Sequence, residues 1–323
     1  MTTIAPPPFD PELAAALAAT GQDTVATGIT PDTLADARAA LLEGVPSVAD
    51  LAADGTYDVE ELAVPGPEGG QDVPLLVIRP RDAVGLRPVV YHTHGGGLIM
   101  GNNRFGVDLV LEWARELGLI VVSVGYRLAP EHPFPAGLDD AHAGLRWVHE
   151  HAGEIGGDAR RIVLAGGSAG GTLAAALAQL TRDRGDVEVL GQLLMYPMLD
   201  DRNDSVSVRQ MAGIGVWDGI SNATGWSAWL AGRPGADAPR YAVPARERDL
   251  AGLPPAFLDV GSAETFRDEV VEYAGRIWAA GGEAELHVWP GAFHGFDFLA
   301  PQAELSQRAR QARLHWLRRL LGE

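Results

Sequence analysis

The 323-residue sequence contains no cysteine, which excludes disulfide bonds and thiolate metal sites. No uninterrupted apolar run approaches the ~20 residues that a membrane-spanning helix needs. The first residues, MTTIAPPPFDPEL, have neither the basic nor the apolar stretch of a signal peptide. Basic residues are scarce, with 25 Lys and Arg against 43 Asp and Glu, and the net charge of −18 disfavours nucleic acids and anionic membranes as partners. The sequence therefore predicts a cytoplasmic protein that binds no nucleic acid and does not insert into membranes.

Hydrophobic residues, in contrast, make up 46% of the chain. A chain of about 300 residues buries roughly three quarters of the surface that its unfolded form exposes, so a large core is expected. Eight segments have the apolar, β-branched character of strands. They are Tyr57–Val64, Val73–Pro80, Val89–Thr93, Leu119–Gly125, Ile162–Gly166, Leu190–Tyr196, Ala256–Val260 and Glu285–Trp289.

Helical segments separate most of these strands. They are Asp108–Leu117, Leu138–His151, Ala169–Arg182, Phe266–Ala280 and Ala303–Leu321. Strands that alternate with helices of this length predict an α/β fold, with a mainly parallel sheet and helices on both faces. Most of the later strands are continuous apolar runs, which suits a sheet buried on both sides. The first two or three strands follow one another closely, so we expect antiparallel pairing at one edge.

Two segments depart from this alternation. Residues 1–56 are rich in Ala, Asp, Thr and Pro and contain two candidate helices, Pro11–Thr20 and Asp32–Glu43, whose apolar faces are too weak to stand alone. Residues 200–240 hold four large apolar side chains among glycines and polar residues: Met211, Trp217, Trp226 and Trp229. We predict a lid from this insertion, packed over a core formed by residues 57–199 and 241–323.

The first candidate for chemistry is Ser168, in Gly166-Gly167-Ser168-Ala169-Gly170 between a strand and a helix. This matches G-x-S-x-G, in which glycines let the flanking backbones pass a strained serine closely. The N-terminus of the following helix favours negative charge beside the hydroxyl. Alternatives are a plain glycine-rich loop or a phosphate-binding turn. Since the segment lacks the lysine of a P-loop and no acidic residue stands out for a ribose, we expect no cofactor.

The second candidate is His94-Gly95-Gly96-Gly97, directly after a predicted strand. Consecutive glycines expose backbone N–H groups that can donate to an oxyanion, and one such donor is worth about 3 kcal/mol in a transition state. An ordinary turn is the alternative. A metal site built on His92 and His94 is a third reading, but no further ligand follows at a suitable spacing, so we expect no metal.

A histidine and an acid follow later in the chain. Among the nine histidines, His294 stands in a glycine-flanked loop just past a late strand. Three carboxylates precede it: Asp259 within a strand, Asp268 in the first turn of a helix, and Glu264 in the loop between them. We favour Glu264, because a loop carboxylate can turn towards the histidine.

The order of these groups is serine, acid, histidine, each just beyond the C-terminal end of a different strand. In open α/β sheets this edge is where ligands bind. The α/β-hydrolase fold has the same order. The pattern therefore predicts nucleophilic catalysis by Ser168, His294 and Glu264.

Four motifs together resemble the hormone-sensitive-lipase-like, or bacterial family IV, esterases. They are HGGG at 94–97 with Gly101 after it, YRLAPEHPFPA at 126–136, GGSAGG at 166–171 and HGF at 294–296. The similarity extends from about Val73 to Phe296. It implies an eight-stranded α/β-hydrolase core with a helical cap built from the N-terminal helices and the insertion. It also implies backbone oxyanion donors at Gly96, Gly97 and Ala169, short-chain acyl esters as substrates, analogy to acetyl and heroin esterases, and a possible homodimer.

Two positions depart from the family pattern. The family usually has aspartate before the serine, where this chain has Gly167. The family acid is usually the aspartate of a D-P-L-x-D-E stretch, where this chain has Glu264. The lid residues Trp217 and Trp226 are predicted to bind substrate, although core packing is the more common use of tryptophan.

The prediction is thus a serine carboxylesterase. The alternatives are a non-catalytic small-molecule receptor on a hydrolase scaffold, as the gibberellin receptors of plants are, and an amide or lactone hydrolase.

Overall fold

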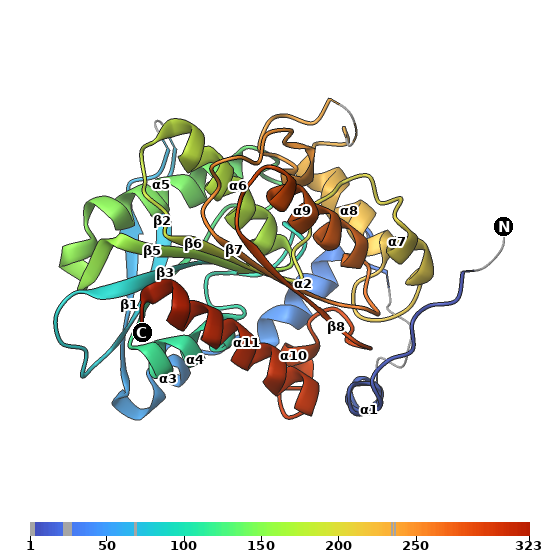
Figure 1. The fold of residues 1–323 in the computed structure, drawn as a ribbon, viewed down its shortest axis with the longest axis horizontal. Helices are drawn as coiled ribbons and strands as arrows, with labels where there is room; N and C mark the ends of the chain where they lie inside the picture. Colours follow the sequence, from blue (N-terminus) through green and yellow to red (C-terminus); the bar gives the residue numbers. More distant parts are fainter. Residues whose placement is uncertain (1–3, 22–27, 68–69, 234, 236) are drawn as a thin grey trace.

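A computed structural model describes residues 4–21, 28–67, 70–233, 235 and 237–323. Its centre is an eight-stranded sheet in the order β1-β2-β4-β3-β5-β6-β7-β8 (Figure 1). The strands are β1 (Tyr57–Val64), β2 (Val73–Pro80), β3 (Arg87–Thr93), β4 (Ile120–Val124), β5 (Gly157–Gly167), β6 (Gly191–Met195), β7 (Ala256–Gly261) and β8 (Ala284–Trp289).

Strand direction changes only at the edge that the sequence indicates. Strand β2 pairs antiparallel with both β1 and β4, while all pairs from β4 to β8 are parallel. Strands β4, β6 and β7 are buried along their whole length, as the continuous apolar runs predict. The predicted α/β fold with a mostly parallel eight-stranded sheet is confirmed.

Helices cover both faces of the sheet. Figure 1 shows α5 (Ala136–Glu150), α6 (Ala169–Arg184) and α9 (Arg267–Ala279) on one side, and α4 (Val107–Leu117) and α11 (Glu304–Leu321) on the other. Each of these helices differs from its predicted range by at most two residues at either end. The largest difference in a strand is in β5, which begins at Gly157 instead of Ile162. The charged residues Asp158, Arg160 and Arg161 interrupt the apolar pattern in this first part of the strand.

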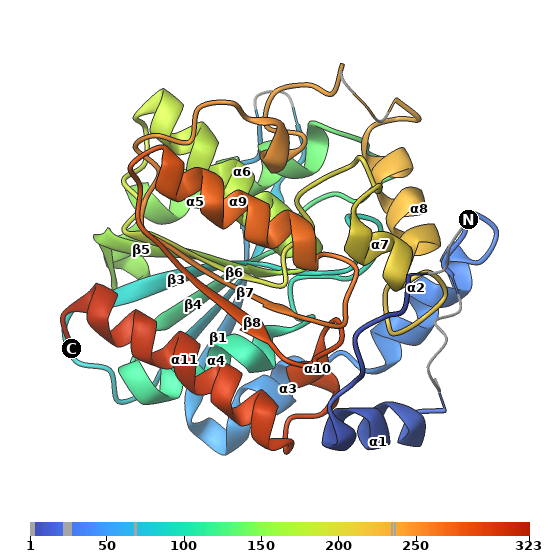
Figure 2. The same ribbon diagram turned by 45° about the vertical axis from the view of Figure 1, so that its right-hand side comes forward.

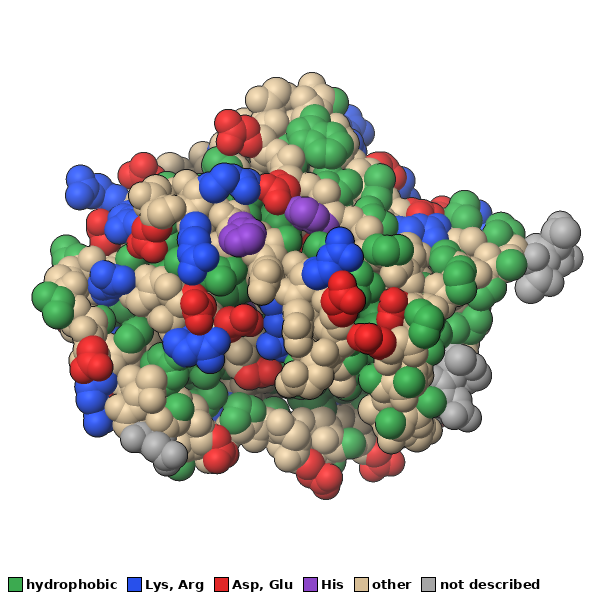
Figure 3. Space-filling view, turned by 60° about the horizontal axis from the view of Figure 1, so that its bottom comes forward, with side chains coloured by type: hydrophobic (Ala, Val, Ile, Leu, Met, Phe, Trp, Pro, Cys, Tyr) green, Lys and Arg blue, Asp and Glu red, His purple; other side chains and the backbone are tan. Residues whose placement is uncertain are grey.

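On the outer face of α4 and α11, charges of opposite sign are interspersed (Figure 3). Arg310 and Arg318 of α11 lie 3.6 Å and 3.9 Å from Glu112 and Glu116 of α4. The sequence contains no lysine, so the blue side chains of Figure 3 are arginines. Exposed pairs of this kind contribute little each, about 0–1 kcal/mol.

Parts of the two segments outside the predicted core lie together. The N-terminal segment forms α1 (Pro11–Ala19), α2 (Leu34–Glu43) and α3 (Val48–Leu51), and the insertion forms α7 (Val206–Gln210) and α8 (Gly219–Trp229). Figure 2 shows α2, α7 and α8 together at one end of the sheet. Residues 1–3, 22–27, 234 and 236 of the two predicted segments lie outside the described residues.

Direct contacts join these segments. The Ile29 amide donates to Ser221 Oγ at 2.9 Å, and Gln210 Nε2 donates to the Ala5 carbonyl at 2.8 Å. Arg38 of α2 donates to the carbonyls of Ile99 and Ala129, which anchors the N-terminal segment to the core. That the segments act together as a cap stays a prediction.

Candidate active site

The turn at Ser168 joins the end of β5 to the start of α6. Ser168 has φ 57° and ψ −124°, a backbone region that side chains with a Cβ rarely adopt. The surroundings fix this conformation: the Ser168 amide donates to the Met195 carbonyl at 2.9 Å, and the Met198 amide donates to the Ser168 carbonyl at 3.0 Å. A Cβ at Gly170 would lie 2.0 Å from the Thr93 carbonyl oxygen, so only glycine permits this close passage.

The structure brings together the side chains of Ser168, His294 and Glu264, the three predicted catalytic residues. Ser168 Oγ lies 2.9 Å from His294 Nε2, and His294 Nδ1 lies 3.1 Å from Glu264 Oε1. The other oxygen of Glu264 accepts the Gly261 amide at 2.9 Å, and its side chain is fully buried. With its proton on Nδ1, the imidazole donates to the carboxylate and offers Nε2 as acceptor to the hydroxyl. This is the arrangement that activates a serine nucleophile.

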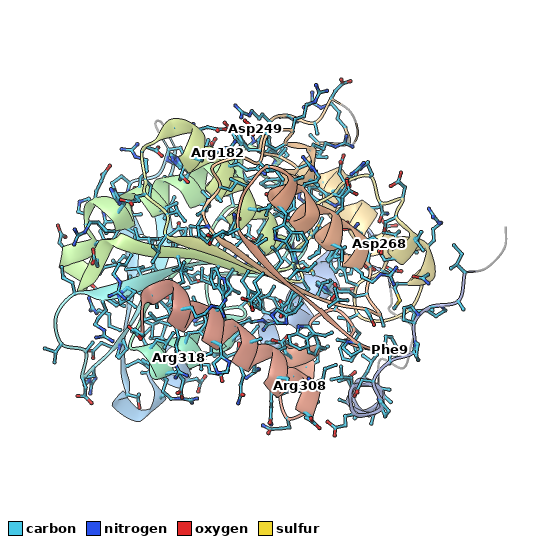
Figure 4. The ribbon with its side chains drawn as sticks, viewed as in Figure 1. Phe9, Arg182, Asp249, Asp268, Arg308 and Arg318 are labelled. Atoms are coloured by element: carbon cyan, nitrogen blue, oxygen red, sulfur yellow. The ribbon has the colours of Figure 1, made fainter. Side chains whose placement is uncertain are left out.

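The two other candidate acids lie elsewhere. Asp259 Oδ2 accepts Trp289 Nε1 at 3.0 Å and faces Arg313. Asp268 stands at the start of α9 (Figure 4), where Oδ2 accepts the Ser207 amide at 2.8 Å. Of the three carboxylates, Glu264 is the one in contact with the imidazole.

Aromatic rings enclose His294, which is only 8% exposed. Tyr196 and Phe266 approach its ring edge-to-face, with centroid distances of 5.1 Å and 5.0 Å. The preceding residue, Phe293, packs against Phe9 of the N-terminal segment at 5.9 Å, at the lower right of Figure 4. These contacts hold the imidazole in one orientation and limit access of water.

The HGGG loop lies beside the nucleophile: a Cβ at Gly95 would be 3.6 Å from Ser168 Cβ. Gly96 and Gly97 have φ of 110° and 64°, and a Cβ at Gly96 would be 2.3 Å from the Met100 carbonyl oxygen. Among the described residues, nothing accepts a hydrogen bond from the backbone N–H groups of Gly96, Gly97 or Ala169. Unpaired amides near an attacking oxygen are the donors that an oxyanion requires.

His92 and His94 are buried and uncharged. Burial, together with the nearby His94, lowers the pKa of His92 to about 3, and burial lowers the pKa of His94 to about 4. His92 Nδ1 lies 2.9 Å from Ser123 Oγ, and His94 Nδ1 donates to the Gly95 carbonyl at 2.8 Å. Across the described ranges, no group of three or more His, Cys, Asp and Glu residues is placed to hold a metal ion.

Trp217 stands against the HGGG loop. A Cβ at Gly97 would be 2.3 Å from Cη2 of its ring, and its carbonyl accepts Thr265 Oγ1 at 2.6 Å. Helix α8 approaches the same loop, since a Cβ at Gly225 would be 2.7 Å from the Gly97 carbonyl oxygen. Trp226 of α8 is 1% exposed, and its indole N–H donates to no described residue. The structure thus places Trp217 beside the HGGG loop, whereas Trp226 lies on the buried face of α8.

Two neighbours of the site were missed in the sequence. Tyr196 follows β6, and its Cε2 would be 3.3 Å from a Cβ at Gly167, so the tyrosine ring packs against the turn at this glycine. Arg313 of α11 lies beneath this tyrosine, with its guanidinium carbon 5.7 Å from the ring centroid. The burial of Arg313 could have been predicted from the sequence, because it is spaced four residues from Ala309 and from Leu317 on the buried face of α11.

Known proteins are similar to this chain in sequence and in structure. A family model described as the alpha/beta hydrolase fold matches residues 90–298. The chain is 38% identical to Esterase LipI and 41% identical to Carboxylesterase NlhH, both of Mycobacterium tuberculosis, over 74% of this chain and 74% and 75% of theirs.

Two solved structures agree with these sequence matches. A bacterial heroin esterase superimposes with a TM-score of 0.86 at 37% identity, over 97% of this chain and 98% of the other. The esterase LipW of Mycobacterium marinum superimposes with a TM-score of 0.87 at 37% identity, over 99% of both chains.

The chain therefore belongs to the α/β-hydrolase fold family. The predicted resemblance to hormone-sensitive-lipase-like esterases is confirmed, and so is the predicted enzyme class, a carboxylic ester hydrolase. Within the described part of the chain, none of the helices has the length and apolar character needed to cross a membrane.

Proposed function

We propose that the protein is a serine carboxylesterase that hydrolyses short-chain acyl esters through an acyl-enzyme intermediate on Ser168. The observation that carries the proposal is the continuous chain of contacts from Ser168 through His294 to Glu264, at 2.9 Å and 3.1 Å, beside unpaired backbone amides. No cofactor enters the reaction, since the nucleophile, the base and the oxyanion donors all belong to the chain.

In the first step, Ser168 Oγ attacks the ester carbonyl carbon while His294 Nε2 takes the hydroxyl proton. Glu264 accepts the Nδ1–H hydrogen bond and stabilises the imidazolium that forms. The carbonyl oxygen becomes an oxyanion and receives hydrogen bonds from the amides of Gly96, Gly97 and Ala169. The C–O bond to the alcohol then breaks, and the alcohol leaves with the proton from Nε2.

In the second step, water replaces the alcohol. His294 Nε2 takes a proton from the water as its oxygen attacks the acyl carbon, and the same amides receive the new oxyanion. The bond to Ser168 Oγ breaks, the carboxylic acid leaves, and the serine regains its proton from Nε2. The base is neutral at the start of each step, as the cycle requires.

Trp217 supports a preference for short acyl groups. Its ring lies against Gly97 and leaves no room for a Cβ there, so it forms a wall beside the oxyanion loop. Ser168 is 9% exposed and His294 is 8% exposed, so little of either residue is accessible from solvent. A bulky acyl chain has little space between this wall and the nucleophile.

The test combines turnover and labelling. Wild-type protein should hydrolyse p-nitrophenyl acetate and be labelled by a fluorophosphonate at Ser168, identified by mass spectrometry of the peptide. Ser168→Ala should lose labelling, with kcat reduced by roughly 10⁴-fold or more. Ser205→Ala, at the N-cap of α7, is the matched control and should keep both. A folded wild-type chain that neither labels nor turns over esters would favour the receptor alternative.

A further inference from the structure

A buried charged cluster lies behind the proposed catalytic residues. Arg313 of α11 is 1% exposed, and its two partners, Asp259 and Asp297, are fully buried. Arg313 Nε donates to Asp259 Oδ2 at 2.9 Å, and Nη1 donates to Asp297 Oδ2. We call Arg313, Asp259 and Asp297 the arginine cluster.

The two carboxylates come from the segments that carry the acid and the base. Asp259 lies in β7, five residues before Glu264. Asp297 lies in the short helix α10 (Phe296–Leu299), three residues after His294. One side chain from a third element, α11, therefore joins the acid segment to the base segment.

Tyr196 extends the cluster to the imidazole. Its amide donates to the Asp259 carbonyl at 2.7 Å, and its ring contacts both the Arg313 guanidinium and the His294 imidazole. The Trp289 indole adds the end of β8 by donating to Asp259 Oδ2 at 3.0 Å. Four segments near the catalytic groups thus meet at Arg313 and Asp259.

The cluster is poorly suited to stability alone. Asp259 Oδ1 and Asp297 Oδ1 accept no well-aligned hydrogen bond among the described residues, while Arg313 Nη2 is ion-paired with Asp259 Oδ2 at 2.8 Å and the Tyr196 side chain interacts with Asp297. Buried polar groups are normally paired, and a partly satisfied charged network is less favourable than apolar packing of the same volume. A role in holding the geometry of the site accounts for keeping it.

We propose that Arg313 is a positioning residue of the esterase reaction, which holds the acid and base segments at the spacing that brings Glu264 into contact with His294. The inference rests on the proposed function. It predicts an effect on kcat, because a misplacement of a reacting group by about 1 Å costs roughly 100-fold in rate. Substrate binding, which Arg313 does not touch, should stay nearly constant.

The first test is Arg313→Lys, which keeps the charge but cannot pair with two carboxylates in the planar geometry of arginine. With p-nitrophenyl acetate we expect kcat to fall by roughly 10- to 100-fold and KM to change less than about 2-fold. Arg313→Met should lower kcat further, so lysine gives a partial rescue. The matched control is Arg127→Lys, which alters another arginine paired with a buried carboxylate, Asp140, and should keep the wild-type kcat.

A second variant covers the case in which Arg313→Met fails to fold, since it leaves two carboxylates buried without a counter-charge. The neutral triple variant Asp259→Asn/Arg313→Met/Asp297→Asn removes all the charges and should fold with a kcat as low as that of a folded Arg313 variant. Wild-type kcat in folded Arg313→Lys or in the triple variant would overturn the proposal. Failure of both to fold would overturn it too, since the cluster would then serve stability. Wild-type labelling and turnover, measured first, show separately whether the proposed function holds.

Discussion

The two sides of the proposed active site are built in different ways. Ser168, Glu264 and His294 follow β5, β7 and β8, so regular backbone pairing of the sheet sets their separation. Trp217 stands in the insertion, where short helices are held by side-chain contacts such as Thr265 Oγ1 to the Trp217 carbonyl. Both sides meet at one loop, where Gly97 touches the tryptophan ring.

This difference in construction suggests that the sheet carries the catalytic groups and that the insertion affects the choice of substrate. Groups that must keep fixed distances follow hydrogen-bonded strands of the central sheet, of which β7 is wholly buried and the edge strand β8 is partly exposed. Trp217, which in the proposed function limits the acyl chain, stands on a segment that can change without disturbing the sheet. Changes on the sheet side should therefore act on kcat, and changes on the insertion side on the choice of substrate.

The largest effect is expected from Glu264→Gln. The glutamine amide is neutral, so it cannot stabilise the imidazolium as the carboxylate does. We therefore expect kcat to fall by roughly 10³- to 10⁴-fold with little change in KM. Steady-state kinetics on p-nitrophenyl acetate measure this. Asp268→Asn, at the neighbouring candidate acid, is the control and should keep activity near wild type. Equal losses in both variants would contradict Glu264 as the acid.

Gly97→Ala should have the next largest effect. The new methyl group would lie 2.3 Å from the Trp217 ring, so the loop must shift and its amide leaves the oxyanion. Loss of one such donor lowers kcat by roughly 10²- to 10³-fold. Gly106→Ala is the control, because Gly106 has a similar φ of 74° with no atom within 4 Å of the added Cβ. The Gly106→Ala variant should have a lower melting temperature, because alanine is strained at a positive φ, but its kcat should stay near wild type.

Trp217→Ala tests the insertion side. Removing the ring opens space beside the loop, so the ratio of kcat/KM for p-nitrophenyl hexanoate over acetate should rise by about 10-fold or more. The activity on acetate itself should change less than the ratio. Trp278→Ala removes a half-exposed tryptophan of α9 and should leave the ratio unchanged. An unchanged ratio in Trp217→Ala would remove the reason to assign acyl selection to this residue.

The smallest effect concerns stability and pH. The pKa of His92 is lowered to about 3 and that of His94 to about 4, so below about pH 6.5 the unfolded chain takes up protons that the folded chain does not. Stability from these two groups is therefore present above pH 6.5 and is lost as the pH falls. Each imidazole contributes about 1.4 kcal/mol per pH unit.

His92→Asn should reduce this pH dependence. Asparagine can still meet Ser123 Oγ, but it does not titrate. Urea unfolding between about pH 5 and 6.5 should show a slope lower by about 1.4 kcal/mol per pH unit. His132→Asn, at an exposed histidine, should leave the slope unchanged. Equal slopes in wild type and His92→Asn would contradict a neutral buried imidazole.

Much of this protein was predictable from local patterns. The continuous apolar runs of β4, β6 and β7 and the helices between them predicted the parallel sheet, and the glycines around Ser168 and after His94 predicted the two turns. The bounds of helix α8 were not predicted, because Gly219, Gly225 and Asn222 are weak helix formers. Tertiary contacts hold this helix, among them those with the HGGG loop, with Ile29 and with the Ala242 carbonyl. The predicted cytoplasmic location and homodimer stay predictions.

The sequence by itself determined the order of the strands along the chain, the positions of the turns and the candidates Ser168, Glu264 and His294, because these depend on spacing and on the steric needs of glycine. Only the tertiary structure shows which of the three carboxylates contacts His294, brings Trp217 against Gly97, and buries Arg313 between Asp259 and Asp297. These outcomes depend on distances of a few ångströms between residues far apart in the chain, which no local pattern encodes.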